Sequence, residues 1–139
     1  MKEWIGYYEN ILSDEISDGI MNIKNGWKPS TYSSHDGNIG LEKSRERVIM
    51  DENYIKNGNT YWAPLCNVTR LTIDLYKKKH PYMIRFMPQK LTDFRVNRYG
   101  KGGFMSEHCD NIHHSHGQQY GFPEASLLFF LNDNYSGGE

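Results

Sequence analysis

The sequence has few of the features that stabilise small secreted proteins or anchor membrane proteins. It holds two cysteines, Cys66 and Cys109, in 139 residues, which is too few for a disulfide framework and favours a reducing compartment. No segment reaches the run of about 18 apolar residues that a membrane-spanning helix needs. The first residues also lack the basic-then-apolar order of a signal peptide. We therefore expect a cytoplasmic protein with no membrane partner.

An excess of charge of either sign is absent as well. Lys and Arg number 16, Asp and Glu number 17, and the formal net charge is −1. Proteins that bind nucleic acid usually carry a positive excess that neutralises phosphates, so the composition does not favour nucleic acid as a partner. We find no internal repeat, low-complexity tract or Pro/Gly-rich linker. A chain of this length can bury a core of its own, and we expect a single domain over 1–139.

Hydrophobic spacing in the first part of the chain predicts two helices. In 14–25, isoleucines recur at helical spacing after Ser13, a residue type that caps helix N-termini. A second helix is predicted for 64–79, with three lysines in its last turn. Its apolar stripe consists of Leu65, Val68, Leu71 and Leu75. The polar stretch 26–40 is predicted to be a loop, so that residues 1–81 form a helical N-terminal support region.

After Pro81 the spacing changes to the alternation that is typical of β-strands. A strand is predicted for 92–99, in which one face carries Phe94, Val96 and Arg98 and the other carries Arg95, Asn97 and Tyr99. Glycines then predict a turn before a second extended segment over 104–110. The apolar run 126–131 predicts a third strand, buried on both faces. Helices followed by strands indicate an α+β fold, with helices on one face of a mainly antiparallel sheet.

The most informative spacing is that of His108, Cys109 and Asp110. Side chains two positions apart in a strand project from the same face, so His108 and Asp110 would point together while Cys109 points away. An imidazole nitrogen and a carboxylate oxygen so placed can supply two corners of the 2-His-1-carboxylate triad that holds non-haem Fe(II). An isolated pair of this kind equally describes two hydrogen-bonded or solvated surface residues, so the surrounding sequence has to decide.

Three motifs surround this pair within residues 94–139. Arg98-Tyr99 is followed by a glycine turn, His108-x-Asp110 begins nine residues after the tyrosine, and a strand end has the sequence Leu131-Asn132-Asp133-Asn134-Tyr135-Ser136-Gly137-Gly138-Glu139. In this combination the segment resembles the prolyl 4-hydroxylase-like oxygenases that depend on 2-oxoglutarate and Fe(II). The resemblance implies a double-stranded β-helix, a cupin-like jelly-roll barrel, with residues 82–139 as its first part and the N-terminal helices flanking it.

The resemblance also implies roles for four residues and a set of cofactors. His108 and Asp110 would be the iron ligands and catalytic residues, while Tyr99 and Asn97 would bind 2-oxoglutarate. The implied cofactors are Fe(II), the co-substrate 2-oxoglutarate and O2, with ascorbate as a further partner of the family. The implied dioxygenase reaction couples decarboxylation of 2-oxoglutarate to succinate and CO2 with hydroxylation of a C–H bond in a protein, peptide or small-molecule substrate.

Two features depart from the pattern of this family. The family's second histidine ligand, and the basic residue that holds the far carboxylate of 2-oxoglutarate, lie after the Gly-Gly-Glu motif, whereas this sequence stops at Glu139. A barrel cut there would leave a sheet edge unpaired, so we expect the sequence to be the N-terminal part of a longer reading frame. Phe130 stands where many of these hydroxylases have a tyrosine that contacts 2-oxoglutarate, and phenylalanine cannot make that hydrogen bond.

Three alternatives stay open at this point. The missing ligand, or a zinc site shared with the H-x-D motif, could come from His113, His114 or His116, although the stretch also fits a solvated connection between strands. Asn97-Arg98-Tyr99 before H-x-D is also similar to the demethylases that repair alkylated nucleic acids, but the Gly-Gly-Glu segment and the net charge favour the hydroxylases. The third alternative is a non-catalytic or truncated barrel that acts as a binding module.

Overall fold

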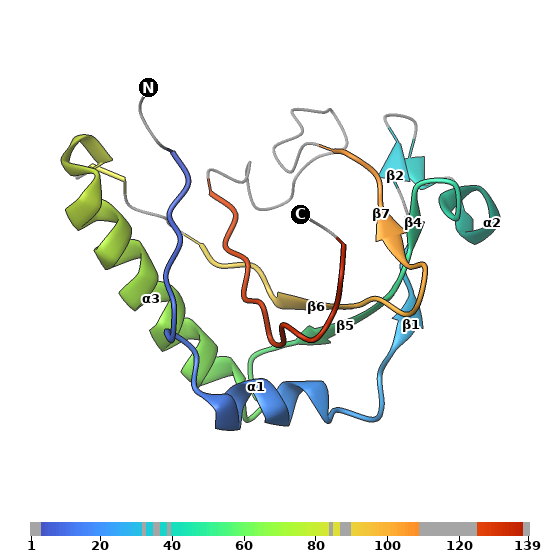
Figure 1. The fold of residues 1–139 in the computed structure, drawn as a ribbon, viewed down its shortest axis with the longest axis horizontal. Coiled ribbons are helices and arrows are strands. Elements are labelled where there is room, and N and C mark those ends of the chain that lie inside the picture. Colours follow the sequence, from blue (N-terminus) through green and yellow to red (C-terminus); the bar gives the residue numbers. More distant parts are fainter. Residues whose placement is uncertain are drawn as a thin grey trace. The chain divides into compact units, whose positions relative to one another are not determined.

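A computed structural model describes residues 4–31, 33–34, 37–38, 40–83, 85–86, 90–108 and 125–137 (Figure 1). The chain is mixed α/β with small antiparallel sheets. Its elements are α1 (Asp14–Met21), β1 (Lys28–Pro29), β2 (Ser33–Ser34), β3 (Gly37–Asn38), α2 (Gly40–Ser44), β4 (Val48–Ile49), β5 (Asp51–Ile55), α3 (Trp62–Lys79), the 3-10 helix η1 (Pro81–Met83), β6 (Phe94–Arg98) and β7 (Phe104–Met105). None of the described helices has both the length and the apolar character that crossing a membrane requires.

The chain divides into two compact units that interleave along the sequence. One unit comprises Met1–Ile23, Lys56–Leu91 and Leu127–Asn134, and it contains α1, α3 and η1. The other comprises Lys24–Ile55, Thr92–Ser126 and Tyr135–Glu139, and it contains the described strands together with α2. Each unit therefore draws on segments that are far apart in the sequence.

Helix α1 begins where the sequence predicts because Ser13 caps it. The Ser13 hydroxyl accepts a hydrogen bond from a backbone N–H of the first turn at 3.4 Å, which is the usual role of serine at this position. The helix ends at Met21 rather than at residue 25; Asn22 is its C-cap residue, and its backbone N–H and side-chain amide both donate to the carbonyl of Asp18. The side chain that α1 buries is Ile20.

Helix α3 confirms the second predicted helix and begins slightly earlier, at Trp62. Its buried stripe differs from the predicted one, since the buried residues are Leu65, Thr69 and Thr72, while Leu71 is exposed. The hydroxyl of Thr72 donates to the carbonyl of Val68 at 2.8 Å. This bond satisfies the hydroxyl of Thr72 inside its own helix, whereas the buried hydroxyl of Thr69 has no hydrogen-bond partner among the described residues.

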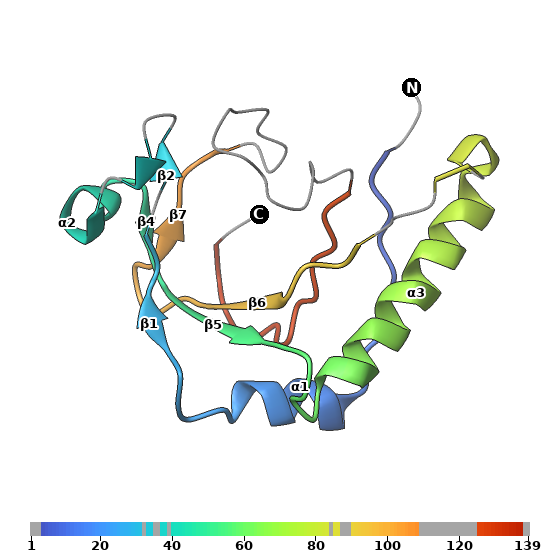
Figure 2. The same cartoon turned by 180° about the vertical axis from the view of Figure 1, so that it is seen from behind.

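Aromatic side chains hold the N-terminal segment against α3. The Tyr76 hydroxyl donates to the carbonyl of Trp4 at 2.8 Å. The Trp4 ring meets the Tyr82 ring edge-on with centroids 5.2 Å apart, a favourable arrangement for two aromatic rings. Both views show this segment, drawn in blue, running beside α3 (Figures 1 and 2). The hydrogen bond from Tyr76 to Trp4 joins residues 72 positions apart in the sequence and connects the N-terminal segment to α3 within the first unit.

The second unit contains three small antiparallel sheets among its described residues. The largest has the order β1-β5-β6, so β5 is its central strand, and Glu52 pairs with Lys28 on one side and with Asn97 on the other. Strand β4 pairs with β7, and β2 pairs with β3. The turn between β6 and β7 confirms the predicted glycine turn: the N–H of Gly103 donates to the carbonyl of Gly100, and Gly102 has a φ of +75°, which suits glycine.

The predicted order of helices before strands is wrong. Strands β4 and β5 precede α3 and pair with β7 and β6, which follow it. Residues 26–40, predicted as a loop, contain β1, β2 and β3. These strands are only two residues long, and so short a pairing leaves no alternation in the sequence that could predict it.

Two predicted strands also differ from the structure. The strand over 104–110 is reduced to β7, extended by one bond from the N–H of Ser106 to the carbonyl of Arg47 at 2.7 Å; residues 109–110 lie outside the described part. The run 126–131 forms no ladder with the described strands, and both Leu128 and Phe130 are exposed rather than buried. Apolar composition favours a strand, but a ladder requires the backbone of a neighbour as well.

Replacing Ile55 by alanine tests the core of the second unit. Ile55 is 1% exposed and lies opposite Phe94 in the ladder, so Ile55→Ala should lower the free energy of unfolding by about 3 kcal/mol through lost burial and a residual cavity. The matched control is Ile5→Ala, at a residue that is 79% exposed, with an expected change below about 0.5 kcal/mol. Urea unfolding measures both, and equal losses would contradict the assigned burial of Ile55.

Candidate functional site

The candidate site lies on one face of strand β6. Arg95 and Asn97 share this face because alternate residues of a strand project to the same side. Tyr99 follows the strand directly and continues the same alternation, and the Arg95 guanidinium lies near enough to influence its hydroxyl. Glu52 of the neighbouring strand stands directly opposite Asn97. The structure thus brings the two predicted 2-oxoglutarate-binding residues, Asn97 and Tyr99, to one polar face.

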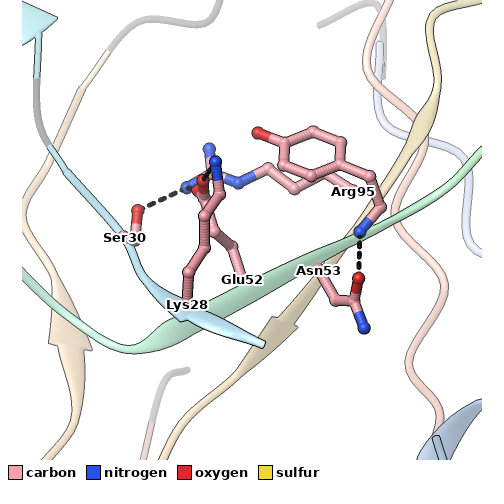
Figure 3. Close-up of polar contacts among 6 residues, drawn as sticks. Lys28, Ser30, Glu52, Asn53 and Arg95 are labelled. Atoms are coloured by element: carbon pink, nitrogen blue, oxygen red, sulfur yellow. Dashed lines mark hydrogen bonds and ion pairs between the residues drawn. The ribbon is translucent and has the colours of Figure 1, made fainter. Parts of the chain in front are cut away.

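A nearly buried carboxylate organises this face (Figure 3). The Glu52 side chain is 9% exposed, and one of its oxygens lies 2.7 Å from Nη2 of Arg95. The other oxygen lies 3.3 Å from Nζ of Lys28. The same Arg95 nitrogen donates to the hydroxyl of buried Ser30 at 2.7 Å. Two cations and one anion leave the cluster with one net positive charge.

The cluster ties together the three strands of the sheet. Its members come from β1, from β5, from β6 and from Ser30, which follows β1. The backbone N–H of Ser30 donates to the carbonyl of Met50 at 2.9 Å, so the serine hydroxyl that meets Arg95 is itself fixed. A carboxylate removed from water is costly unless cations and hydrogen bonds surround it, and the convergence of Lys28 and Arg95 meets that requirement.

The opposite face of β6 carries a different pair. Nη2 of Arg98 donates to Oδ2 of Asp51 at 2.8 Å, and the guanidinium lies 4.1 Å from the ring centroid of Trp27. Both partners of this ion pair are much more exposed, at 52% and 41% of their side chains. Surface ion pairs of this kind contribute little to stability. The face of β6 with Arg95 therefore carries the contacts that hold the sheet together, and the face with Arg98 carries an exposed ion pair.

His108 is exposed and lies just beyond β7, outside the regular strand. Its Nδ1 is 3.0 Å from the carbonyl of Ser106. A carbonyl only accepts, so this contact is a hydrogen bond when Nδ1 carries the proton, and in that neutral tautomer the lone pair is on Nε2. Histidines that bind metals through Nε2 are commonly oriented in this way. The conformation of His108 therefore fits a metal ligand.

The partners predicted for His108 are not placed by the structure. Asp110 lies outside the described residues, as do Cys109 and the histidine cluster His113, His114 and His116. Within the part of the chain that is described, three or more metal-binding side chains do not come together. Phe130, which replaces a 2-oxoglutarate-contacting tyrosine in the resemblance, is exposed.

Sequence reasoning missed Lys28, Ser30 and Glu52 as parts of this face. The alternation in 92–99 predicts that Arg95 shares a face with Asn97, but it indicates no function for Arg95. The missed residues lie in or directly after β1 and in β5, which belong to segments predicted as a loop and as helical support. Strand pairing brings them to the face of Asn97; Glu52 and Asn97, which pair directly, are 45 positions apart in the sequence. Glu52 stands between Asp51 and Asn53, both polar, so this segment lacks the apolar-polar alternation that would predict a strand.

Comparison with known proteins adds no assignment to this site: no family model, curated protein or solved structure matches the chain. The site therefore has to be interpreted from the chemistry of its own residues.

The Glu52–Arg95 and Asp51–Arg98 contacts make a matched comparison, because the Glu52 side chain is 9% exposed and the Asp51 side chain is 41% exposed. Glu52→Gln should lower the free energy of unfolding by about 1–3 kcal/mol, because it leaves Arg95 and Lys28 without their shared anion. Asp51→Asn removes a contact of nearly the same length at an exposed position, and the expected loss is below about 1 kcal/mol. Denaturant unfolding ranks the two; a larger loss for Asp51→Asn would contradict the role given to Glu52.

The ionisation of Tyr99 reports directly on Arg95. Partial burial raises the pKa of Tyr99 above its usual value of 10.0, while the Arg95 guanidinium acts in the opposite direction. Arg95→Met should therefore raise this pKa further, and Arg98→Met, on the other face, should leave it unchanged. Phenolate absorbance, with the Tyr99→Phe titration subtracted, measures the value.

The same shift has a consequence for stability. Because the folded-state pKa of Tyr99 is the higher one, its stabilising contribution is complete below about pH 10 and is lost as the pH rises through the folded-state pKa. Tyr99→Phe should remove this alkaline component. An unchanged loss of stability above pH 10 in the variant would contradict the assignment to Tyr99.

Proposed function

We propose that the chain carries part of the catalytic core of a Fe(II)- and 2-oxoglutarate-dependent dioxygenase of the prolyl 4-hydroxylase-like type. The observation that carries the proposal is the polar face of β6, on which Asn97 and Tyr99 stand together beside a cluster with one net positive charge. In this proposal the small antiparallel sheets are the first strands of a double-stranded β-helix.

The charge of this face suits the proposed co-substrate. 2-Oxoglutarate is a dianion, and the excess of Lys28 and Arg95 over Glu52 favours a negative ligand nearby. The phenol of Tyr99 is protonated at neutral pH, as in any tyrosine whose pKa is at or above 10.0, so it can donate a hydrogen bond to a carboxylate. The amide of Asn97 offers both a donor and an acceptor.

The orientation of His108 supports the metal part of the proposal. With the proton held on Nδ1 by the Ser106 carbonyl, His108 would bind Fe(II) through Nε2, and Asp110 would supply the carboxylate ligand of the facial triad. When bound, the metal would supply the activation of O2 for hydroxylation of a C–H bond. His108 and Asp110 would hold the metal, and Asn97 and Tyr99 would orient the co-substrate beside it.

Each residue of the face has a defined task in this scheme. Asn97 and Tyr99 bind and orient the co-substrate through hydrogen bonds, while the Glu52–Arg95 contact fixes the strand from which they project. The substrate class proposed is a protein, a peptide or a small molecule in the cytoplasm, with no nucleic acid or membrane as partner. Ascorbate is proposed as an accessory reductant, on the family resemblance alone.

The decisive assay is the Fe(II)-dependent turnover of 2-oxoglutarate to succinate by the complete product of the gene. His108→Ala and Asp110→Ala should each abolish turnover and weaken Mn(II) binding measured by electron paramagnetic resonance. Asn97→Ala and Tyr99→Phe should raise the KM for 2-oxoglutarate about tenfold, as expected for the loss of a hydrogen bond to a charged group, and leave Mn(II) binding unchanged.

The control for these variants is Glu107→Gln, an exposed neighbour of His108 with no proposed role, which should retain full turnover. Retained activity in His108→Ala or Asp110→Ala would overturn the ligand assignment. Absence of turnover in the unaltered protein, together with undiminished 2-oxoglutarate binding, would favour a binding module over an enzyme.

A further inference from the structure

A second candidate site lies in the unit that contains the sheets. It is a cleft of about 350 Å³, and neither Asn97 nor Tyr99 lines it. Its walls include apolar side chains from α2, from β4 and from Met50, which precedes β5, among them Leu41, Val48 and Ile49. Val48 is buried, whereas Leu41 and Ile49 are exposed large hydrophobic residues. The cleft therefore offers an apolar surface that is open to solvent.

Two arginines stand at this apolar surface with a single carboxylate. The lining includes Arg45, Arg98 and Asp51. Arg98 is already oriented, because it contacts Asp51 at 2.8 Å and stacks over Trp27. Arg45 is exposed and takes part in none of the ion pairs found among the described residues. The cleft thus has one positive charge in excess.

A glycine is among the residues that line the cleft. Gly100 lines the cleft, and a Cβ built on it would meet no atom within 4 Å. Its φ lies outside the left-handed region, unlike that of Gly102, so a side chain at this position is sterically permitted. A larger residue at this edge of the cleft therefore tests the site without straining the backbone.

We propose that this cleft binds a carboxylate that carries a short apolar body. The apolar walls would bury the body, and Arg45 would bind the carboxylate with the oriented Arg98 beside it, since guanidinium groups match carboxylates in charge and geometry. A volume of about 350 Å³ is within the usual range for small-molecule sites. The chemistry is shared by free medium-chain acids and by the carboxyl terminus of a peptide that ends in an apolar residue.

Isothermal titration calorimetry with sodium octanoate tests the proposal, and octanamide serves as the uncharged analogue. Octanoate should bind about twofold to fivefold more tightly than octanamide, as expected for one exposed ion pair, and added salt should reduce the difference. Acetyl-glycyl-leucine, as the free acid, distinguishes the two sources: tighter binding than octanoate indicates a peptide terminus, and weaker binding indicates a free acid. The titrations contain no iron and no 2-oxoglutarate, so they are independent of the proposed oxygenase activity.

Three variants locate the binding. Arg45→Gln should weaken octanoate binding about fivefold, whereas Lys43→Gln, a neighbouring cation that does not line the cleft, should leave it unchanged. Gly100→Leu should abolish binding while the melting temperature stays near that of the unaltered protein. Undetectable octanoate binding, equal binding of octanamide, or full binding by both Arg45→Gln and Gly100→Leu would overturn the proposal.

Discussion

The sheet of the second unit depends on the requirement that the Glu52 carboxylate, once removed from water, be surrounded by cations and donors. Glu52 stands on the central strand, and Lys28 and Arg95 reach it from the strands on either side. The strands are short, and β1 contributes only two residues to its ladder, so backbone pairing alone specifies their register weakly. A charged cluster that closes in one register only supplies the missing specificity.

The same cluster determines what the neighbouring residues can do. Because Arg95 is held by Glu52 and Ser30, the strand that carries Asn97 is fixed relative to the sheet. The alternation of β6 then assigns Asn97 and Tyr99 to a positively charged face and Arg98 to the opposite face, where it contacts Asp51 and Trp27. One strand thereby serves two distinct surfaces, the proposed co-substrate face and the wall of the arginine-lined cleft.

Local signals predicted those parts of the fold that local interactions stabilise. Ser13 caps α1 by accepting a hydrogen bond from the N–H of Ile16. The apolar spacing that predicted the second helix lies within α3 alone. The turn at Gly100 to Gly103 depends on the φ that Gly102 adopts. The buried stripe of α3 was predicted less well, because which face of a helix is covered depends on the segments that pack on it and a threonine can satisfy its own hydroxyl.

The sequence by itself determined the start of α1, the glycine turn, the alternation that places Asn97 with Tyr99, and the His108-x-Asp110 spacing. Only the tertiary structure decided that Lys28, Ser30 and Glu52 belong beside them, that 26–40 contributes strands, and that the apolar run 126–131 stays outside the described ladders. The physical reason is the range of the interactions. Caps, turns and alternation act within a few residues, whereas strand partners and ion pairs join positions that are close only after folding.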